Sequence, residues 1–200
     1  VMNILNFYES TRDIDDNIYF CFATNTETIW HYHRSLEIIA VFEGTFEIRV
    51  SHHVYNAKKG DIFMIPPYCH HSIKRGNSKS VTLIVPPNLL GDYYSVYQKY
   101  HCDFLLYDTD FNENEIFPLF FKAERFNNQT TLKGLFDMTI GIISSHYPFI
   151  KDIQPQIDFI AQTVGFLQVN YAEKITLEEI SKHLGYSKYY FSKLFNAYMK

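Results

Sequence analysis

The chain has 200 residues, of which 46% are hydrophobic and 20% charged, so it can bury a core and is not a disordered polypeptide. Its formal net charge of −4 excludes a uniformly basic nucleic-acid coat. It has no apolar run of membrane-spanning length, no secretory signal and no CxxC pair among its three cysteines, so we expect a cytoplasmic protein with reduced thiols and no membrane partner.

The first half of the chain has the pattern of short strands. Apolar and polar residues alternate over residues 46–50, which is the period of a half-buried strand. Residues 62–65 and 81–85 are short apolar runs closed by proline pairs, and residues 30–42 form a longer aromatic and β-branched run. Many short strands with frequent turn signals predict a sandwich or small barrel over residues 1–110.

Beyond the last of these strands the apolar spacing becomes helical. Apolar residues recur every three to four positions over residues 132–143 and 157–171. Tyr147-Pro148 predicts the end of the first of these helices, because the residue before proline disfavours the α region. We therefore divide the second half into a helical connector, residues 111–150, and a small helical unit, residues 151–200. Loops are expected at residues 112–115 and 127–131.

Residues 175–200 hold the most specific signal in the sequence. Thr176 and Glu179, three positions apart, predict a capping box at the start of a helix. Gly185 suits a tight turn, and Ser187 suits the cap of a second helix. This spacing is typical of a helix-turn-helix, whose second helix enters the major groove of DNA. An ordinary helical hairpin with a solvated lysine face fits the same spacing.

The run ITLEEISKHLGYSKYYFSKLFNAYMK resembles the first helix-turn-helix of the AraC/XylS family of bacterial transcription regulators. Residues 155–171 resemble the first helix of that family's DNA-binding domain. The resemblance implies double-stranded DNA as a partner of the full-length protein. By motif position, the resemblance places Tyr189, Ser192 and Lys193 toward base edges. It places Ser187 and Lys188 near phosphate, and Asn196 lies on the same outer face of the second helix.

The sequence departs from the AraC/XylS pattern at its C-terminal end. The family's DNA-binding domain carries two helix-turn-helix units joined by a long helix, and this sequence stops at Lys200, where the joining helix should follow. We therefore expect a truncated, incomplete DNA-binding domain. Such a domain lacks half of the base contacts and the cations that release further counterions, so we expect weak DNA binding or none.

Residues 31–44 and 60–71 resemble the two motifs of the cupin superfamily, although Tyr68 replaces a motif glycine and the asparagine expected after His71 is absent. AraC-type regulators use the same jelly-roll-like barrel as their effector domain. The two resemblances therefore imply one β + α architecture. It has an N-terminal cupin-like jelly-roll barrel, a helical connector and a C-terminal helix-turn-helix.

Four barrel residues match the metal-ligand positions of cupin enzymes: His31, His33, Glu37 and His71. On a strand, side chains two positions apart point to one face, so His31 and His33 are expected to act together. Three imidazoles and a carboxylate are able to hold Zn²⁺, Mn²⁺ or Fe²⁺. AraC-type barrels often retain these residues without being metalloenzymes. We therefore expect no resident metal, cofactor or catalytic residue, and assign the four residues to an effector pocket or to structural packing.

The expected effector is a small molecule, since aromatic walls with a few polar groups suit such a pocket and aromatic faces suit sugar rings. Sugars are among the common effectors of the family. A tightly filled barrel explains the aromatic residues equally well. Residues 1–17 are a candidate arm over this pocket. The effector-pocket candidates are Tyr19, Phe22, His31, His33, Glu37 and His71.

The apolar face of the connector predicts either packing on its own barrel or a homodimer interface, since paired DNA half-sites mirror the symmetry of a dimer. The chain is thus interpreted as a transcription regulator whose barrel shifts the population of DNA-binding states when an effector binds. Two alternatives remain. One is a metal-dependent cupin enzyme, and the other is an effector-independent regulator whose barrel serves dimerisation or binds a partner protein.

Overall fold

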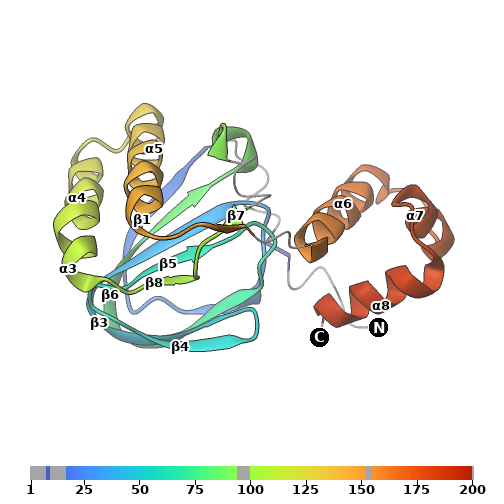
Figure 1. Cartoon of the computed structure of the whole chain (residues 1–200), viewed down its shortest axis with the longest axis horizontal. Helices are drawn as coiled ribbons and strands as arrows, with labels where there is room; N and C mark the ends of the chain where they lie inside the picture. Colours follow the sequence, from blue (N-terminus) through green and yellow to red (C-terminus); the bar gives the residue numbers. More distant parts are fainter. Residues whose placement is uncertain (1–7, 10–16, 94–99, 152–154, 200) are drawn as a thin grey trace. The chain divides into compact units, whose positions relative to one another are not determined.

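The computed structural model describes residues 8–9, 17–93, 100–151 and 155–199 (Figure 1). The chain divides into two compact units, residues 1–152 and residues 153–200. The first unit contains the β domain together with the helices of the connector. The second unit contains three helices near the C-terminus.

The first unit is built on one antiparallel sheet of seven strands in the order β1-β6-β3-β5-β8, with β2 also paired to β6 and β4 to β3. Each of the three runs read from the sequence as a short strand lies within one of these strands, so those predictions are confirmed. The strands are β1 (Tyr19–Thr24), β2 (Thr28–His31), β3 (Leu36–Val50), β4 (His53–Lys58), β5 (Ile62–Ile65), β6 (His71–Val85) and β8 (Leu105–Leu106).

The two long strands, β3 and β6, pair with each other along most of their length, and the pairing shifts register on both sides of Gly44. Before this irregularity Ile39 and Val41 belong to a buried apolar cluster on one face of the sheet. After it Ile48 and Val50 belong to the same cluster. In a regular strand the side chains that face one side of the sheet are all at odd positions or all at even positions. The irregularity changes the positions that face this cluster from odd to even. The single apolar core on this side is therefore continuous around the bend.

The aromatic and β-branched run over residues 30–42 does not form one continuous strand. The chain leaves β2 at His31 and enters β3 at Leu36, with a short connection between them. The backbone N–H of Tyr68 donates to the carbonyl of His33 at 2.7 Å, so the connection is hydrogen-bonded outside the sheet. Propensity favours a strand here, but this tertiary contact decides the local backbone.

The helices of the first unit cover the other face of the sheet (Figure 1). Phe42 of β3 lies 4.6 Å from the ring of Phe117, and Phe20 of β1 stacks 6.3 Å from Phe120. The apolar stripe predicted over residues 132–143 packs into the same core. Among the described residues no helix combines the length and apolarity needed to cross a bilayer. The remaining elements are η2 (Pro87–Leu89), β7 (Tyr100–His101), α3 (Thr109–Phe111), the π-helix η3 (Asn112–Ile116), α4 (Phe117–Arg125), α5 (Gln129–His146) and β9 (Ile150–Lys151), which pairs with β7.

The loop expected at residues 112–115 is wrong, and the loop expected at residues 127–131 is shorter than predicted, since only residues 127 and 128 of that range lie outside a helix. Residues 112–116 form the π-helix η3, and α5 already begins at Gln129, with the Asn128 side chain accepting a hydrogen bond from the N–H of Thr131. Asparagine favours turns because its side chain competes for backbone groups, but the same side chain also caps helices. The predicted helix end at Tyr147-Pro148 is confirmed, since α5 ends at His146.

The fully buried side chain of Asn112 joins three parts of the first unit. Its Nδ2 donates to the carbonyls of Gly60 (2.9 Å) and Leu106 (2.8 Å), and its Oδ1 accepts from the Tyr147 hydroxyl (2.9 Å). We expect Asn112→Ala to lower the free energy of unfolding by about 2 kcal/mol, because it leaves buried carbonyls unpaired. Chemical denaturation measures this. Asn114→Ala, an exposed position in the same turn, is the control, and an equal effect in both variants contradicts the assignment.

The second unit contains α6 (Pro155–Asn170), α7 (Leu177–His183) and α8 (Lys188–Met199). Its small core centres on Phe159, whose ring lies 5.6 Å from Tyr186 and 5.1 Å from Phe191. Ile180 of α7 is buried with them. One aromatic residue of α6 thus holds both the turn and the second helix of the helix-turn-helix.

The local signals that predicted this motif are confirmed. The N–H of Thr176 donates to Glu179 Oε2 (2.8 Å) and the N–H of Glu179 donates to Thr176 Oγ1 (3.2 Å), which is the reciprocal capping box. Gly185 has φ +75°, the left-handed region that favours glycine. Ser187 Oγ accepts from the N–H of Tyr190 at 3.2 Å and so caps α8.

Candidate functional site

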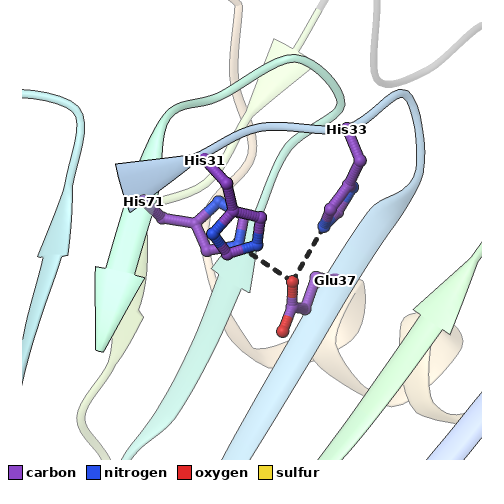
Figure 2. Close-up of side chains that lie close together, drawn as sticks. All are labelled: His31, His33, Glu37 and His71. Atoms are coloured by element: carbon purple, nitrogen blue, oxygen red, sulfur yellow. Dashed lines mark hydrogen bonds and ion pairs between the residues drawn. The ribbon is translucent and has the colours of Figure 1, made fainter. Parts of the chain in front are cut away.

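Four polar side chains of the β domain point toward one another (Figure 2). His31 ends β2, His33 lies in the connection that follows, Glu37 is the second residue of β3, and His71 is the first residue of β6. The register of the sheet places His31 directly opposite His71. One ligand atom from each of the four lies within 4.8 Å of all the others. We call these four residues the His–Glu cluster.

Two histidines of the cluster contact the same carboxylate oxygen. Glu37 Oε2 lies 2.9 Å from His33 Nε2 and 3.0 Å from His71 Nε2 (Figure 2). The other ring nitrogen, Nδ1, lies 3.0 Å from the carbonyl of Ser35 in His33 and 2.9 Å from the carbonyl of Cys69 in His71. Carbonyl and carboxylate oxygens only accept hydrogen bonds, so each ring faces an acceptor at both of its nitrogens.

This arrangement demands a positive charge at the centre of the cluster. A neutral imidazole has one N–H, so a ring whose Nδ1–H donates to a carbonyl aims a lone pair from Nε2 at Glu37. That contact is favourable only with a proton or a metal cation between the two atoms. Supplying protons to both His33 and His71 puts two imidazolium charges against one carboxylate in a buried site, which is costly.

The electrostatics of the metal-free cluster centre on the pair of His71 and Glu37. Burial raises the pKa of Glu37, but the charge of His71 and the hydrogen bonds from His33 and His71 outweigh it and hold that pKa well below its usual range. Burial lowers the pKa of His71, and Glu37 more than compensates, so that pKa lies above its usual value. Burial and the charge of His71 lower the pKa of His31. The directions of the two pKa shifts thus favour the charged forms of both His71 and Glu37.

The residues present fit a divalent transition metal. Three imidazole nitrogens and one carboxylate are ligands that Zn²⁺, Mn²⁺ and Fe²⁺ accept. The Nδ1 of His31 also contacts a carbonyl, that of Ile29, at 2.8 Å. Backbone carbonyls at Nδ1 fix the ring orientation of metal-binding histidines and leave Nε2 for the ion. His31, His33, Glu37 and His71 would hold the metal.

The sequence predicted the membership of this cluster but not how its backbone is arranged. His31 and His33 do lie close together, but His33 lies outside the strand. The alternation of a single strand is therefore not what brings them to one side. The carbonyls of Ile29, Ser35 and Cys69 that orient the rings are backbone groups, and no side-chain pattern reveals them.

The other two effector-pocket candidates lie on β1. Phe22 points to the helices, where its ring stacks 5.4 Å from Phe42 and 5.8 Å from Phe121, so the structure does not bring it to the His–Glu cluster. Tyr19 is 40% exposed. Three positions separate these residues, so they point to opposite faces of the strand.

Glu9 is a residue near the cluster that the motif reading did not find. Its Oε2 lies 3.6 Å from His31 Nε2. The candidate arm, residues 1–17, lies mostly outside the described residues, but Tyr8 forms an isolated parallel bridge to Tyr32 and the N–H of Glu9 donates to the carbonyl of Tyr32 at 3.0 Å. Glu9 precedes the first cupin-like motif by more than twenty residues, so spacing gave no signal for it.

A second candidate site is the outer face of α8. Of the six residues predicted to face DNA, five are exposed and Ser192 is half-buried. Tyr189 is 80% exposed. Tyr189, Lys193 and Asn196 are spaced by four and three residues, which places them on one face of the helix. Lys188 Nζ contacts Glu178 Oε2 at 2.7 Å across the turn between the two helices.

Comparison with protein families assigns both parts of the chain. Residues 18–86 match the model of the cupin domain, and residues 167–200 match the model of bacterial regulatory helix-turn-helix proteins of the AraC family. The chain thus joins a cupin domain to an AraC-type helix-turn-helix. The cupin match covers the His–Glu cluster, and the AraC-type match covers all six residues predicted to face DNA.

Two solved structures share this AraC-type fold over most of the chain. The AraC-like transcriptional activator CuxR aligns with a TM-score of 0.52 and 16% identity, over 90% of this chain and 71% of that chain. ToxT from Vibrio cholerae aligns with a TM-score of 0.55 and 11% identity, over 92% of this chain and 77% of that chain. At these identities the likeness concerns the fold. No curated protein matches the sequence significantly.

Proposed function

We propose that this chain is a transcription regulator that acts by binding rather than by catalysis, with α8 contacting DNA and the β domain binding the effector. The observation that carries the proposal is the joining of an AraC-type helix-turn-helix to a cupin domain in which four ligand atoms lie within 4.8 Å of one another. An effector changes DNA binding by as much as its affinities for the two states differ.

The His–Glu cluster is the proposed effector site, and a divalent transition metal is its proposed ligand. The acceptors at both nitrogens of His33 and His71 favour a cation over an uncharged sugar at the centre of the cluster. Metal analysis and a thermal-shift screen with Zn²⁺, Mn²⁺, Fe²⁺ and sugars on one sample test this. Stabilisation by sugars alone assigns an organic effector. Stabilisation by no ligand favours an effector-independent regulator.

DNA binding through α8 is tested by selecting duplexes from a random pool with the full chain at low ionic strength, where phosphate contacts contribute most. We expect Lys193→Ala to weaken binding about tenfold and to relax sequence preference at one position, since a base contact contributes about 1–3 kcal/mol of discrimination. Lys59→Ala, an exposed lysine of the first unit paired with Glu113, is the control. Selection of no sequence contradicts the proposal.

The proposed regulator is a homodimer that uses the outer face of α5. A shallow groove of ≈550 Å³ runs there beside α3 and η3, and Met138 on its rim is 56% exposed. A Cβ added at Gly134 or Gly141 meets nothing within 4 Å, so the helix surface is open at both positions. We expect Met138→Glu to shift the protein from dimer to monomer in sedimentation experiments. Val54→Glu on β4, an exposed apolar position, is the control, and a wild-type monomer contradicts the proposal.

A further inference from the structure

The N-terminal segment brings a second carboxylate to the edge of the His–Glu cluster. Glu9 Oε2 lies 3.6 Å from His31 Nε2, and the negative charge of Glu9 also acts on His71. Two ligand atoms at 2.0–2.2 Å from one ion lie at most about 4.4 Å apart. The separation of Glu9 and His31 is within that limit, so these two atoms are close enough to share one ion; Glu9 lies beside the group of four residues whose ligand atoms all lie within 4.8 Å of one another.

The hydrogen bonds of His31 repeat the pattern seen in the other two histidines. Its Nδ1 lies 2.8 Å from the carbonyl of Ile29, so in the neutral ring this nitrogen carries the proton and Nε2 presents a lone pair. That lone pair faces the carboxylate of Glu9, just as the Nε2 atoms of His33 and His71 face the carboxylate of Glu37. All three imidazoles therefore direct Nε2 toward a carboxylate oxygen.

We infer that Glu9 is a fifth ligand of the metal ion, added by the N-terminal segment to the three histidines and Glu37. The inference rests on the proposed binding of a divalent metal at the cluster. The backbone of Glu9 is held in place, because its N–H donates to the carbonyl of Tyr32 and the Tyr8 and Tyr32 rings lie 5.2 Å apart. Tyr32 lies between His31 and His33, so the same short stretch holds both the segment and two ligands.

This fifth ligand gives the ion a second role. An ion that binds Glu9 cross-links residues 8–9 to the end of β2, the start of β3 and the start of β6. It also fills a coordination position with protein, which leaves less room for an exogenous substrate than a four-ligand site. The cluster then suits sensing of the ion itself better than catalysis on a bound molecule.

Titration of the full chain with Co²⁺ and Zn²⁺ tests the inference in three proteins: wild type, Glu9→Gln and Glu27→Gln. Glu27 is exposed and precedes β2, so it is a matched control. We expect one Co²⁺ per chain and at least about a tenfold weaker affinity in Glu9→Gln. We also expect stronger visible absorption of Co²⁺ in that variant, since absorption rises when the coordination number falls. Zn²⁺ affinity, measured by competition, should fall in parallel.

The outcomes separate the fifth ligand from the site itself. If Glu9→Gln and Glu27→Gln bind Co²⁺ alike and with the same spectrum, Glu9 is not a ligand, while loss of binding in His71→Ala still supports the four-residue site. If the wild-type chain binds neither Co²⁺ nor Zn²⁺, the proposed metal site and the fifth ligand are both wrong. Matching circular dichroism and thermal unfolding of the metal-free proteins confirms that Glu9→Gln is folded.

Discussion

Replacing His71 with alanine is expected to remove the stabilisation that the proposed metal ion gives this protein. In the wild type, a free ion concentration 100 times the dissociation constant adds about 2.7 kcal/mol to the free energy of unfolding. His71→Ala deletes a fully enclosed ligand that contacts Glu37 at 3.0 Å, so we expect that gain to vanish. Thermal unfolding with and without Zn²⁺ measures it.

The same substitution also destabilises the metal-free protein. Glu37 is buried and, among the described residues, keeps its hydrogen bond with His33 when His71 is lost, and breaking a buried charged pair costs about 3 kcal/mol. His53 is an exposed histidine at the start of β4. His53→Ala should change neither the stability gained from Zn²⁺ nor the free energy of unfolding of the metal-free protein. A His71→Ala protein that still gains stability from Zn²⁺ would place the ion elsewhere.

Replacing Gly44 with alanine is expected to lower the free energy of unfolding by about 3 kcal/mol or more. Gly44 has φ +72°, which strains a residue with a Cβ, and the added Cβ lies 1.8 Å from the carbonyl oxygen of Asn77 on β6. Neither backbone is free to move without breaking β3–β6 hydrogen bonds. The substitution therefore acts on the central strand pair of the sheet.

Gly91→Ala separates the two contributions in that prediction. Gly91 also has positive φ, +58°, but an added Cβ meets nothing within 4 Å. We expect Gly91→Ala to lower the free energy of unfolding by about 1 kcal/mol, which is the backbone strain alone. Urea denaturation of both variants gives the comparison, and equal losses at Gly44 and Gly91 would show that contact with Asn77 adds nothing.

The parts of the fold that were predicted correctly rest on local signals. A capping box is made by residues three apart, so Thr176 and Glu179 reveal the start of α7 without knowledge of the rest of the chain. The cupin-like motifs likewise carry their ligands at fixed spacing. His31, His33, Glu37 and His71 were therefore identified together, and the structure brings them together.

The parts that were missed depend on contacts between distant segments. The break between β2 and β3 is held by Tyr68, and the π-helix at Asn112 is held by carbonyls of Gly60 and Leu106. Glu9 reaches His31 only because the N-terminal segment bridges to Tyr32. No pattern within a short window reports such contacts, because they are set by which strands and helices become neighbours.

The sequence separation within the His–Glu cluster has a kinetic consequence. His71 is 34 residues from Glu37, and the two meet only after β6 has paired with both β2 and β3. Contacts of this range form slowly in β proteins because the loop must close before any contact is gained. We therefore expect tight ion binding to appear with the final native sheet rather than in early compact states, so that Co²⁺ absorption during refolding reports the completion of that sheet.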